Sequence, residues 1–226
     1  MIDFVRQRRN MVDSQLKTNE VTDRRILSAM AELPRERFVP QAMSLLAYID
    51  ESVEVFPARD GAPARYLLPP LSLARLAQLA SVAPGDKVLD VGCATGYSTA
   101  LLARLAASVV GLEPEPELAE TARRVLGNLS VGNASVIEGA LAGGAPKEGP
   151  FDVILLNGSV EQIPDALLSQ LREGGRLVAV LASAKTMSLG KAYLFVKVDG
   201  EASGLPHFDA GARPLPGFAR APAFAF

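Results

Sequence analysis

The feature that most constrains the fold is an alternation of apolar runs and helical segments between Lys87 and Ala182. Helical segments such as ELAETARRVLGNL separate the apolar runs, which read KVLDVG, SVVGLE, SVIEG, FDVILLNG and GRLVAVLA. Such alternation predicts a parallel sheet with helices on both faces. The runs KVLDV and DVILLN are almost continuously apolar, as is typical of strands covered on both sides.

The pattern changes after Ala182. Two extended runs, KAYLFVKV and EASGLPHF, flank the pair Asp199-Gly200. An Asp-Gly pair between extended runs favours a β-hairpin. Five strands and this hairpin together predict a seven-stranded, mostly parallel α/β sheet with an antiparallel hairpin at its C-terminal end.

The segment before Lys87 is organised differently. Residues 2–46 carry helical spacing, with Thr22 as the predicted N-cap of a second helix. Prolines and glycines then crowd the span from Ser52 to Pro70, which we interpret as a long loop. We expect one domain over 1–226, with a helical arm and substrate-side loop at 1–80, a cofactor-binding core at 81–210 and a tail at 211–226.

Composition excludes several classes of function. The chain has 226 residues, 49% of them hydrophobic, and a formal charge of −2, so nucleic acid is not an expected partner. No run of about 18 apolar residues predicts a membrane span. One cysteine, Cys93, and one histidine, His207, provide no metal site. We expect a metal-free cytoplasmic protein, as a monomer or a homodimer.

A glycine-containing loop follows the first strand of the alternation. It reads Asp-Val-Gly-Cys-Ala-Thr-Gly-Tyr over residues 90–97, and Gly92 and Gly96 allow a tight turn and close approach of a ligand. Glu113 ends the second strand, where a carboxylate can accept both hydroxyl hydrogens of a ribose. The loop and the acid together predict a nucleoside site at the carboxyl edge of the sheet.

The loop also indicates which nucleoside cofactor binds. A dinucleotide fingerprint requires G-x-G-x-x-G, whereas this loop has Ala94 and Tyr97 at the second and third glycine positions. A phosphate-binding loop would require Gly-Lys-Ser/Thr, which is absent. S-adenosylmethionine has no pyrophosphate and tolerates a looser loop, so it is the predicted cofactor, with S-adenosylhomocysteine as its product.

Several segments resemble the protein-L-isoaspartate O-methyltransferases, a class I methyltransferase family with a Rossmann-like fold that repairs damaged aspartyl and asparaginyl sites. The resemblance covers most of the first 181 residues. Its most specific part is the N-terminal arm, and it rests on RRNMVDSQLKTNEVTDRRILSAMAELPRERFVP, AYID, APGDKVLDVGCATGYSTALLA, PFDVILLNGSVEQIP and QLREGGRLVAVL. The implied substrate is a protein or peptide that carries isoaspartate, whose carboxylate receives the methyl group.

The resemblance also implies site residues. Gly92, Cys93, Ala94 and Gly96 would line the methionine end of the cofactor, with Cys93 acting through its backbone, and Glu113 would hold the ribose. Asp90 would face the cofactor amino group or cap the following turn. Tyr97 and Asn157 complete the predicted cofactor-binding set on this side.

Two positions depart from the family pattern. The family has a catalytic serine in a Thr-Ile-Ser-Gln-Pro segment, where this chain has Leu68, so no catalytic residue is assigned. Replacement side chains near the crevice would be Arg65, Tyr66, Ser72 and Asn157. The family also has Gly-Asp-Gly facing the adenine, where this chain has residues 139–141, Gly-Ala-Leu, with Glu138 as a neighbouring substitute for the acid.

Other functions remain open at this point. The apolar YLLPPL segment favours a methyltransferase with a different acceptor. A non-catalytic cofactor-binding protein could instead dock a partner through the arm and the tail FARAPAFAF. An NAD-dependent dehydrogenase is disfavoured by Ala94 and Tyr97.

Overall fold

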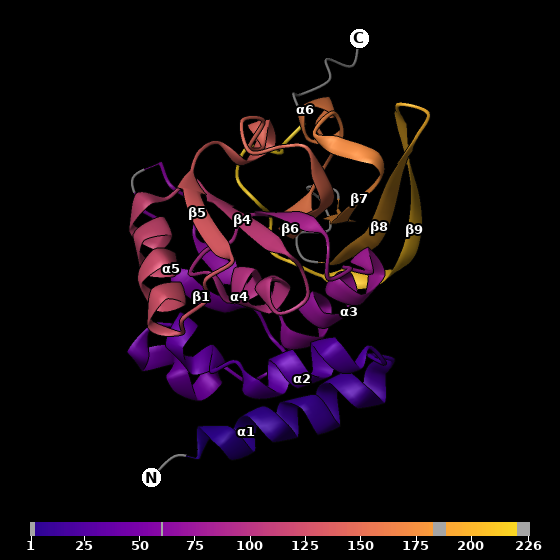
Figure 1. Ribbon diagram of the computed structural model, residues 1–226. Coiled ribbons are helices and arrows are strands. Elements are labelled where there is room, and N and C mark those ends of the chain that lie inside the picture. The colour runs from indigo at the N-terminus through magenta and orange to yellow at the C-terminus, as the bar shows by residue number, and fades with distance from the viewer. Residues whose placement is uncertain (1–2, 60, 183–188, 221–226) are drawn as a thin grey trace.

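A seven-stranded sheet forms the centre of the computed structural model, which describes residues 3–59, 61–182 and 189–220 (Figure 1). In spatial order the strands are β5 (Ala134–Glu138), β4 (Ser108–Glu113), β3 (Lys87–Val91), β6 (Phe151–Val160), β7 (Leu171–Leu181), β8 (Leu189–Val198) and β9 (Glu201–Gly211). Strand β8 runs antiparallel to both of its neighbours, and the other pairs are parallel. The predicted sheet and its C-terminal hairpin are therefore confirmed.

The hairpin turn between β8 and β9 is made by two residues that tolerate positive φ angles. Asp199 and Gly200 have φ angles of 53° and 82°. Positive φ at both central residues is the mark of a two-residue type I′ turn, which glycine and aspartate tolerate. The turn joins β8 to β9 with Val198 opposite Glu201.

Three helices and the N-terminal arm cover one face of the sheet. The helices are α3 (Pro70–Ala80), α4 (Tyr97–Ala103) and α5 (Pro116–Asn128). Helices α3 and α5 each carry proline within the first turn, where its missing N–H costs nothing. Their buried side chains pack against the sheet residues Val88, Val153 and Val178 in one hydrophobic cluster.

The other face is covered by much shorter elements. These are the 3₁₀ turn η5 (Leu141–Gly143), helix α6 (Asp165–Leu168) and a C-terminal segment, residues 212–218. Leu215 and Phe218 of this segment are buried together with Leu89 and Leu156 of the sheet. The C-terminal segment is thus part of the core.

The N-terminal arm is helical, as predicted, and lies below the sheet in Figure 1. Its elements are α1 (Phe4–Met11), the π-helical turn η1 (Val12–Leu16), the 3₁₀ turn η2 (Lys17–Asn19), α2 (Arg24–Glu32) and the 3₁₀ turns η3 (Arg35–Phe38) and η4 (Gln41–Leu46). The N-cap of α2 is Asp23, not Thr22. The Asp23 side chain accepts the Arg25 N–H at 2.8 Å, whereas the Thr22 N–H donates to Gln78.

The span from Ser52 to Pro70 is more ordered than the predicted loop. It contains the antiparallel pair β1 (Val53–Phe56) and β2 (Arg65–Leu67). This small sheet carries Arg65, Tyr66 and Leu67 to the carboxyl edge of the main sheet, where they line a hollow with Asn157 of β6. Within the described ranges, no helix is long and apolar enough to cross a membrane.

Candidate active site

The glycine loop leaves the carboxyl end of β3 in a conformation that its sequence dictates. Gly92, Ala94 and Gly96 all have positive φ, at 78°, 49° and 92°. A Cβ on Gly96 would lie 3.1 Å from the Ala122 Cβ, so glycine lets the loop pack against α5. The N–H groups of Gly92 and Cys93 both donate to the Leu112 carbonyl, which ties the start of the loop to the end of β4.

Asp90 is fully buried beneath this loop. Its carboxylate accepts the hydroxyls of Ser98 and Thr99 at 2.8 and 2.6 Å and the Asn157 amide. Burial raises the Asp90 pKa to about 6, although the three donors oppose the shift. These contacts tie the start of α4 to β3 and β6 through side chains. The N-cap of α4 is Gly96, without a side-chain cap bond, so Asp90 does not cap the turn.

Glu113 lies at the end of β4, directly beside the loop, and none of its surface is exposed. One carboxylate oxygen accepts the Ala94 N–H at 2.8 Å, and the other pairs with the guanidinium of Arg65. Burial raises the Glu113 pKa, and the Arg65 charge lowers it in opposition. The predicted ribose-binding acid is therefore in the predicted place, but the chain itself occupies both of its oxygens.

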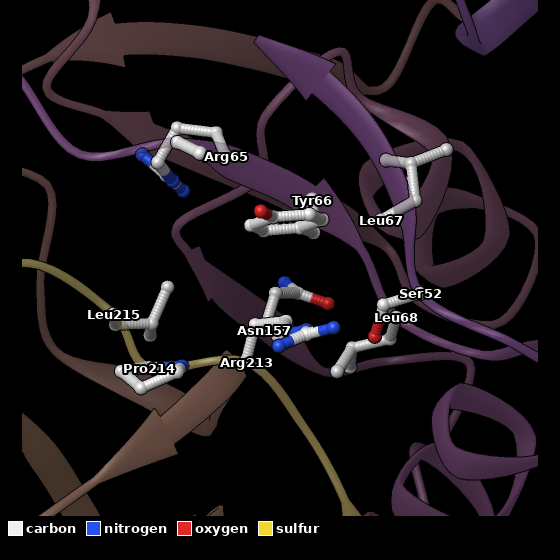
Figure 2. Close-up of a pocket in the computed structure, with 10 residues that line it drawn as sticks. Ser52, Arg65, Tyr66, Leu67, Leu68, Asn157, Arg213, Pro214 and Leu215 are labelled. Carbon is white, nitrogen blue, oxygen red and sulfur yellow. The ribbon is translucent and has the colours of Figure 1, made fainter. Parts of the chain in front are cut away.

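Two side chains lie against the bare face of Gly92, and we call them the crevice plug: Arg65 and Leu215. Both also line the hollow drawn in Figure 2. Arg65 also donates to the Gly92 carbonyl at 3.3 Å. A Cβ on Gly92 would lie 2.8 Å from Leu215 Cδ2 and 3.2 Å from Arg65 Nη2. The plug therefore covers the bare face of the first loop glycine.

The C-terminal segment is held against β6 by backbone contacts. The Ser159 N–H donates to the Arg213 carbonyl, and the Leu215 N–H donates back to the Ser159 carbonyl, both at 2.9 Å. Gly158 makes the approach possible, because a Cβ there would lie 2.7 Å from the Arg213 carbonyl oxygen. This close pairing places Leu215 over the loop.

Three of the predicted acceptor-side residues, Arg65, Tyr66 and Asn157, line a small hollow between β2, β6 and the C-terminal segment, whereas Ser72 does not (Figure 2). The Tyr66 ring faces the Arg213 guanidinium at 5.3 Å, and Asn157 lies beside them. Tyr66 donates its hydroxyl to Glu54 at 3.2 Å, and Ser72 donates its hydroxyl to the Gly211 carbonyl at 3.0 Å. Two of the candidate replacements for the missing serine are thus already engaged elsewhere.

Leu68, at the family serine position, is buried and lines this hollow and a second one beside the loop. Each hollow has a free volume of about 10 Å³. That is about the space that one water molecule requires. Neither hollow is large enough for a small-molecule cofactor, and both residues of the crevice plug line the first of them.

The remaining predicted residues lie at the edge of the crevice or below it. Glu138 is exposed and forms an ion pair with Arg123 at 2.9 Å, while Ala140 is exposed and Gly139 half-buried. Cys93 is buried, and burial raises the pKa of its thiol well above the ordinary value. A thiol in that state is a weak nucleophile, in agreement with the predicted backbone role.

A wider cleft of about 680 Å³ lies between the arm and α5. Phe38, Phe56 and Leu118 contribute apolar side chains, and Arg37 and Arg124 contribute positive charge. Its lining shares only Thr95 with the glycine loop and includes neither Glu113 nor Arg65. The cleft therefore lies on the side of the loop that faces the arm, and it is separate from the crevice that contains Glu113.

Sequence reasoning missed two participants in this site. The sequence places Arg65 on the acceptor side, yet in the structure it pairs with Glu113, the acid predicted to bind the ribose. Leu215 was assigned only to a tail, and no local signal placed it over the loop. Among the described residues, no group of three or more histidine, cysteine or acidic side chains is arranged to hold a metal ion.

Comparison with known proteins decides the family. Residues 6–197 match the family model described as protein-L-isoaspartate(D-aspartate) O-methyltransferase (PCMT). A protein-L-isoaspartate O-methyltransferase of Koribacter versatilis is 40% identical over 186 residues, which cover 82% of this chain and 81% of that protein. One from Syntrophobacter fumaroxidans is 34% identical and covers 93% of both chains.

The chain belongs to the protein-L-isoaspartate O-methyltransferase family. A solved structure of a protein with that name superposes with a TM-score of 0.78 at 27% identity, over 92% of this chain and 66% of the solved one. Membership makes the chain a methyltransferase that uses S-adenosylmethionine, as the loop and Glu113 predicted. A Plasmodium falciparum structure described as a complex with S-adenosyl-L-homocysteine, 21% identical with a TM-score of 0.71, agrees in fold.

The donor groups of this chain fit S-adenosylmethionine in kind. A buried carboxylate at the end of β4 suits ribose hydroxyls, and a loop with a bare glycine face suits close contact with the cofactor. The fit requires Arg65 to release Glu113 and Leu215 to leave the face of Gly92. The crevice as described is closed by the chain itself.

Proposed function

We propose that this chain transfers the methyl group of S-adenosylmethionine to the carboxylate of isoaspartyl residues, at the crevice over the carboxyl ends of β3, β4 and β6. The single observation that carries the proposal is the position of Glu113. Its buried carboxylate lies beside the glycine loop and bonds to the loop through the Ala94 N–H. Family membership supports the acceptor class.

On the donor side, each predicted residue receives a role that its contacts support. Glu113 would accept the ribose hydroxyls once Arg65 has withdrawn. Gly92 and Ala94 would present the backbone surface against which the methionine portion lies. Asp90 would position other residues and not contact the donor itself, since it holds Asn157 and the start of α4 in place.

Methyl transfer to a carboxylate requires no general base from the protein. S-adenosylmethionine supplies an electrophilic methyl group on a sulfonium, and an acceptor carboxylate with a pKa of about 4 is already ionised at neutral pH. The chain must orient the acceptor and exclude water. Leu68 and Leu67 give the acceptor side of the crevice an apolar wall that serves the second purpose.

A second candidate keeps the donor and changes the acceptor. The observation that favours it is the buried Leu68 where the family has its serine. A hydroxyl bonded to a charged acceptor contributes about 1.5 to 3 kcal/mol, so its loss lowers the rate by roughly one to two decades. For a less polar acceptor, leucine in place of serine would not lower the rate of methyl transfer.

One assay separates the two candidates. The protein is incubated with labelled S-adenosylmethionine and either an isoaspartyl peptide or the same peptide with normal aspartate. Base-labile methyl ester on the isoaspartyl peptide alone is the expected result. Donor binding without ester would favour another acceptor, and absence of donor binding would contradict the proposal as a whole.

A protein or peptide carrying isoaspartate is the partner that this proposal implies. The formal charge of −2 supports the exclusion of nucleic acid as a partner, which stays a prediction. A monomer or homodimer also stays a prediction. The tail FARAPAFAF, considered above as a docking element, falls mostly outside the described residues, which end at 220.

A further inference from the structure

Arg35 is a fully buried cation between the arm and the core. It opens η3, and no part of its side chain reaches solvent. Its Nε donates to the Ala47 carbonyl at 2.7 Å, and its Nη2 donates to the Leu68 carbonyl at 2.6 Å. Across residues 3–59, 61–182 and 189–220, no carboxylate forms an ion pair with it. A buried charge without a counter-ion is costly, so its persistence calls for a reason.

The third nitrogen of this guanidinium has no hydrogen-bond partner. Arg35 Nη1 is buried and unsatisfied, and so is the hydroxyl of Tyr97. The two side chains are in contact, with the guanidinium carbon 4.6 Å from the centre of the Tyr97 ring. Two orphaned polar groups therefore lie side by side in the interior. Buried polar groups without partners are rare in folded proteins.

Both residues line the hollow beside the glycine loop. Gly92, Cys93 and Ala94 form one part of its wall, and Leu68 forms another. The hollow thus lies between the donor loop and the position of the family serine. Anchoring of the arm explains the two carbonyl contacts of Arg35. The guanidinium and the Tyr97 hydroxyl also stabilise each other at close range, but neither Nη1 nor the hydroxyl has a partner in regular hydrogen-bond geometry.

We propose that Arg35 and Tyr97 form a carboxylate-binding subsite when the crevice opens, since the closed hollow has room for only about one water molecule. A guanidinium presents several N–H donors in a planar fork that matches a carboxylate, and the phenol adds one more donor. Two carboxylates reach the crevice under the proposed function, on which this inference rests. One belongs to the amino-acid end of S-adenosylmethionine, and the other is the isoaspartyl acceptor itself.

The test uses two conservative variants of the full chain. Tyr97→Phe removes only the hydroxyl and keeps the ring against Arg35, whereas Arg35→Lys keeps the charge and removes the fork. Tyr193→Phe, on β8, is the matched control. Thermal unfolding of each variant checks that the fold is retained.

Calorimetry and kinetics distinguish the two sources of the carboxylate. If the donor supplies it, both variants weaken binding of S-adenosylhomocysteine tenfold or more and change binding of its decarboxylated analogue less than twofold. If the acceptor supplies it, both ligands bind as before and the KM for the isoaspartyl peptide rises tenfold or more. Either pattern supports the subsite, and the control should show neither.

A probe that is independent of methyl transfer separates failure of the subsite from failure of the proposed function. Formate, the smallest carboxylate, should raise the melting temperature of the native chain above that in chloride at equal ionic strength, and less so for Tyr97→Phe. This result would support the subsite even if no methyl ester forms. The proposal would be overturned if the variants weakened binding of S-adenosylhomocysteine and of its decarboxylated analogue equally. It would also be overturned if neither the binding data, the KM for the peptide nor the formate experiment differed between the variants and the native chain.

Discussion

At the scale of single residues, the pair formed by Arg65 and Glu113 dominates the chemistry of the crevice. Both side chains are buried, with exposures of 4% and 0%, so neither charge is screened by water. A buried ion pair is hard to break from one side, because the remaining charge is left without compensation. The donor ribose and Arg65 therefore compete for the same carboxylate.

We expect Arg65→Met to bind S-adenosylhomocysteine at least threefold more tightly than the native chain, because Glu113 no longer has to be released. The same variant should unfold at a lower temperature without ligand. Calorimetry and thermal unfolding measure the two effects. Arg172→Met, which removes an exposed pair with Asp152, serves as the control and should change neither by a comparable amount. Weaker binding by Arg65→Met would show that Arg65 supports the bound donor.

Asp90 gives the stability of the protein a predictable dependence on pH. Its pKa is about 6 when folded, against 3.8 for an ordinary aspartate. Between these values the folded state binds more protons than the unfolded state, so the contribution of Asp90 to stability falls as pH rises. From pH 4.5 to 6.5 the loss should be about 2 kcal/mol, with no further loss above.

Urea unfolding over this pH range measures the effect in the native chain and in Asp90→Asn. The unfolding free energy of the native chain minus that of Asp90→Asn should fall by about 2 kcal/mol between pH 4.5 and pH 6.5. Glu113, whose pKa is also raised by burial, contributes in the same direction in both proteins. Its contribution cancels only in part, because Glu113 and Asp90 repel each other. A difference that is constant with pH would contradict the assignment.

Residue identity alone predicted the loop and Glu113, because an acid at a strand end beside a glycine loop is a local pattern. It did not predict the partner of Glu113. The two residues are 48 positions apart, and their contact depends on how β2 packs over the sheet edge. Arg35 was missed for a related reason, since its burial follows from the docking of the arm.

At the scale of elements, the C-terminal segment is the part that covers the first glycine of the loop. It pairs with β6 around Ser159 and carries Leu215 over Gly92. Gly158 is the residue that admits it. An added methyl group would meet Leu215 Cγ at 2.6 Å and a backbone carbonyl at 2.7 Å, and the backbone cannot move without losing the pairing.

Gly158→Ala should therefore detach the segment and cost about 1 to 3 kcal/mol of stability. Hydrogen exchange of the Leu215 amide, which donates to Ser159, should become faster. Gly132→Ala is the matched control, since nothing lies within 4 Å of the Cβ that it adds. Unchanged exchange at Leu215 would mean that the segment is held by other contacts.

The sequence predicted long elements better than short ones. The strands of the main sheet have continuous apolar runs, and those runs specify them without reference to the rest of the chain. Strands β1 and β2 have only four and three residues, and prolines flank them. Their pairing brings together segments separated by a turn, so the local pattern resembled a loop.

At the scale of the whole molecule, the arm and the sheet share one hydrophobic interior. The same buried cluster contains Met11 and Met30 of the arm and Val88 and Val178 of the sheet. Gln78 of α3 adds polar links, because its side chain accepts the N–H groups of Thr22 and Asp23 and donates to the Glu20 carbonyl. These contacts support the prediction of a single domain.

We expect the chain to unfold in urea as one cooperative unit. Far-ultraviolet circular dichroism and intrinsic tyrosine fluorescence, to which Tyr48 in the arm and Tyr97 in the core both contribute, should report the same single midpoint. Gln78→Ala should lower that midpoint without splitting the transition. Two separate midpoints would show that the arm at 1–80 is an independent unit.

The closed crevice also bears on how tightly the donor appears to bind. If only a fraction of molecules has Arg65 and Leu215 withdrawn at any moment, the apparent dissociation constant is the intrinsic one divided by that fraction. Substitutions that stabilise the plug would then weaken donor binding without touching the donor. Affinity for the cofactor is thus a property of the population of open molecules as well as of the residues that hold it.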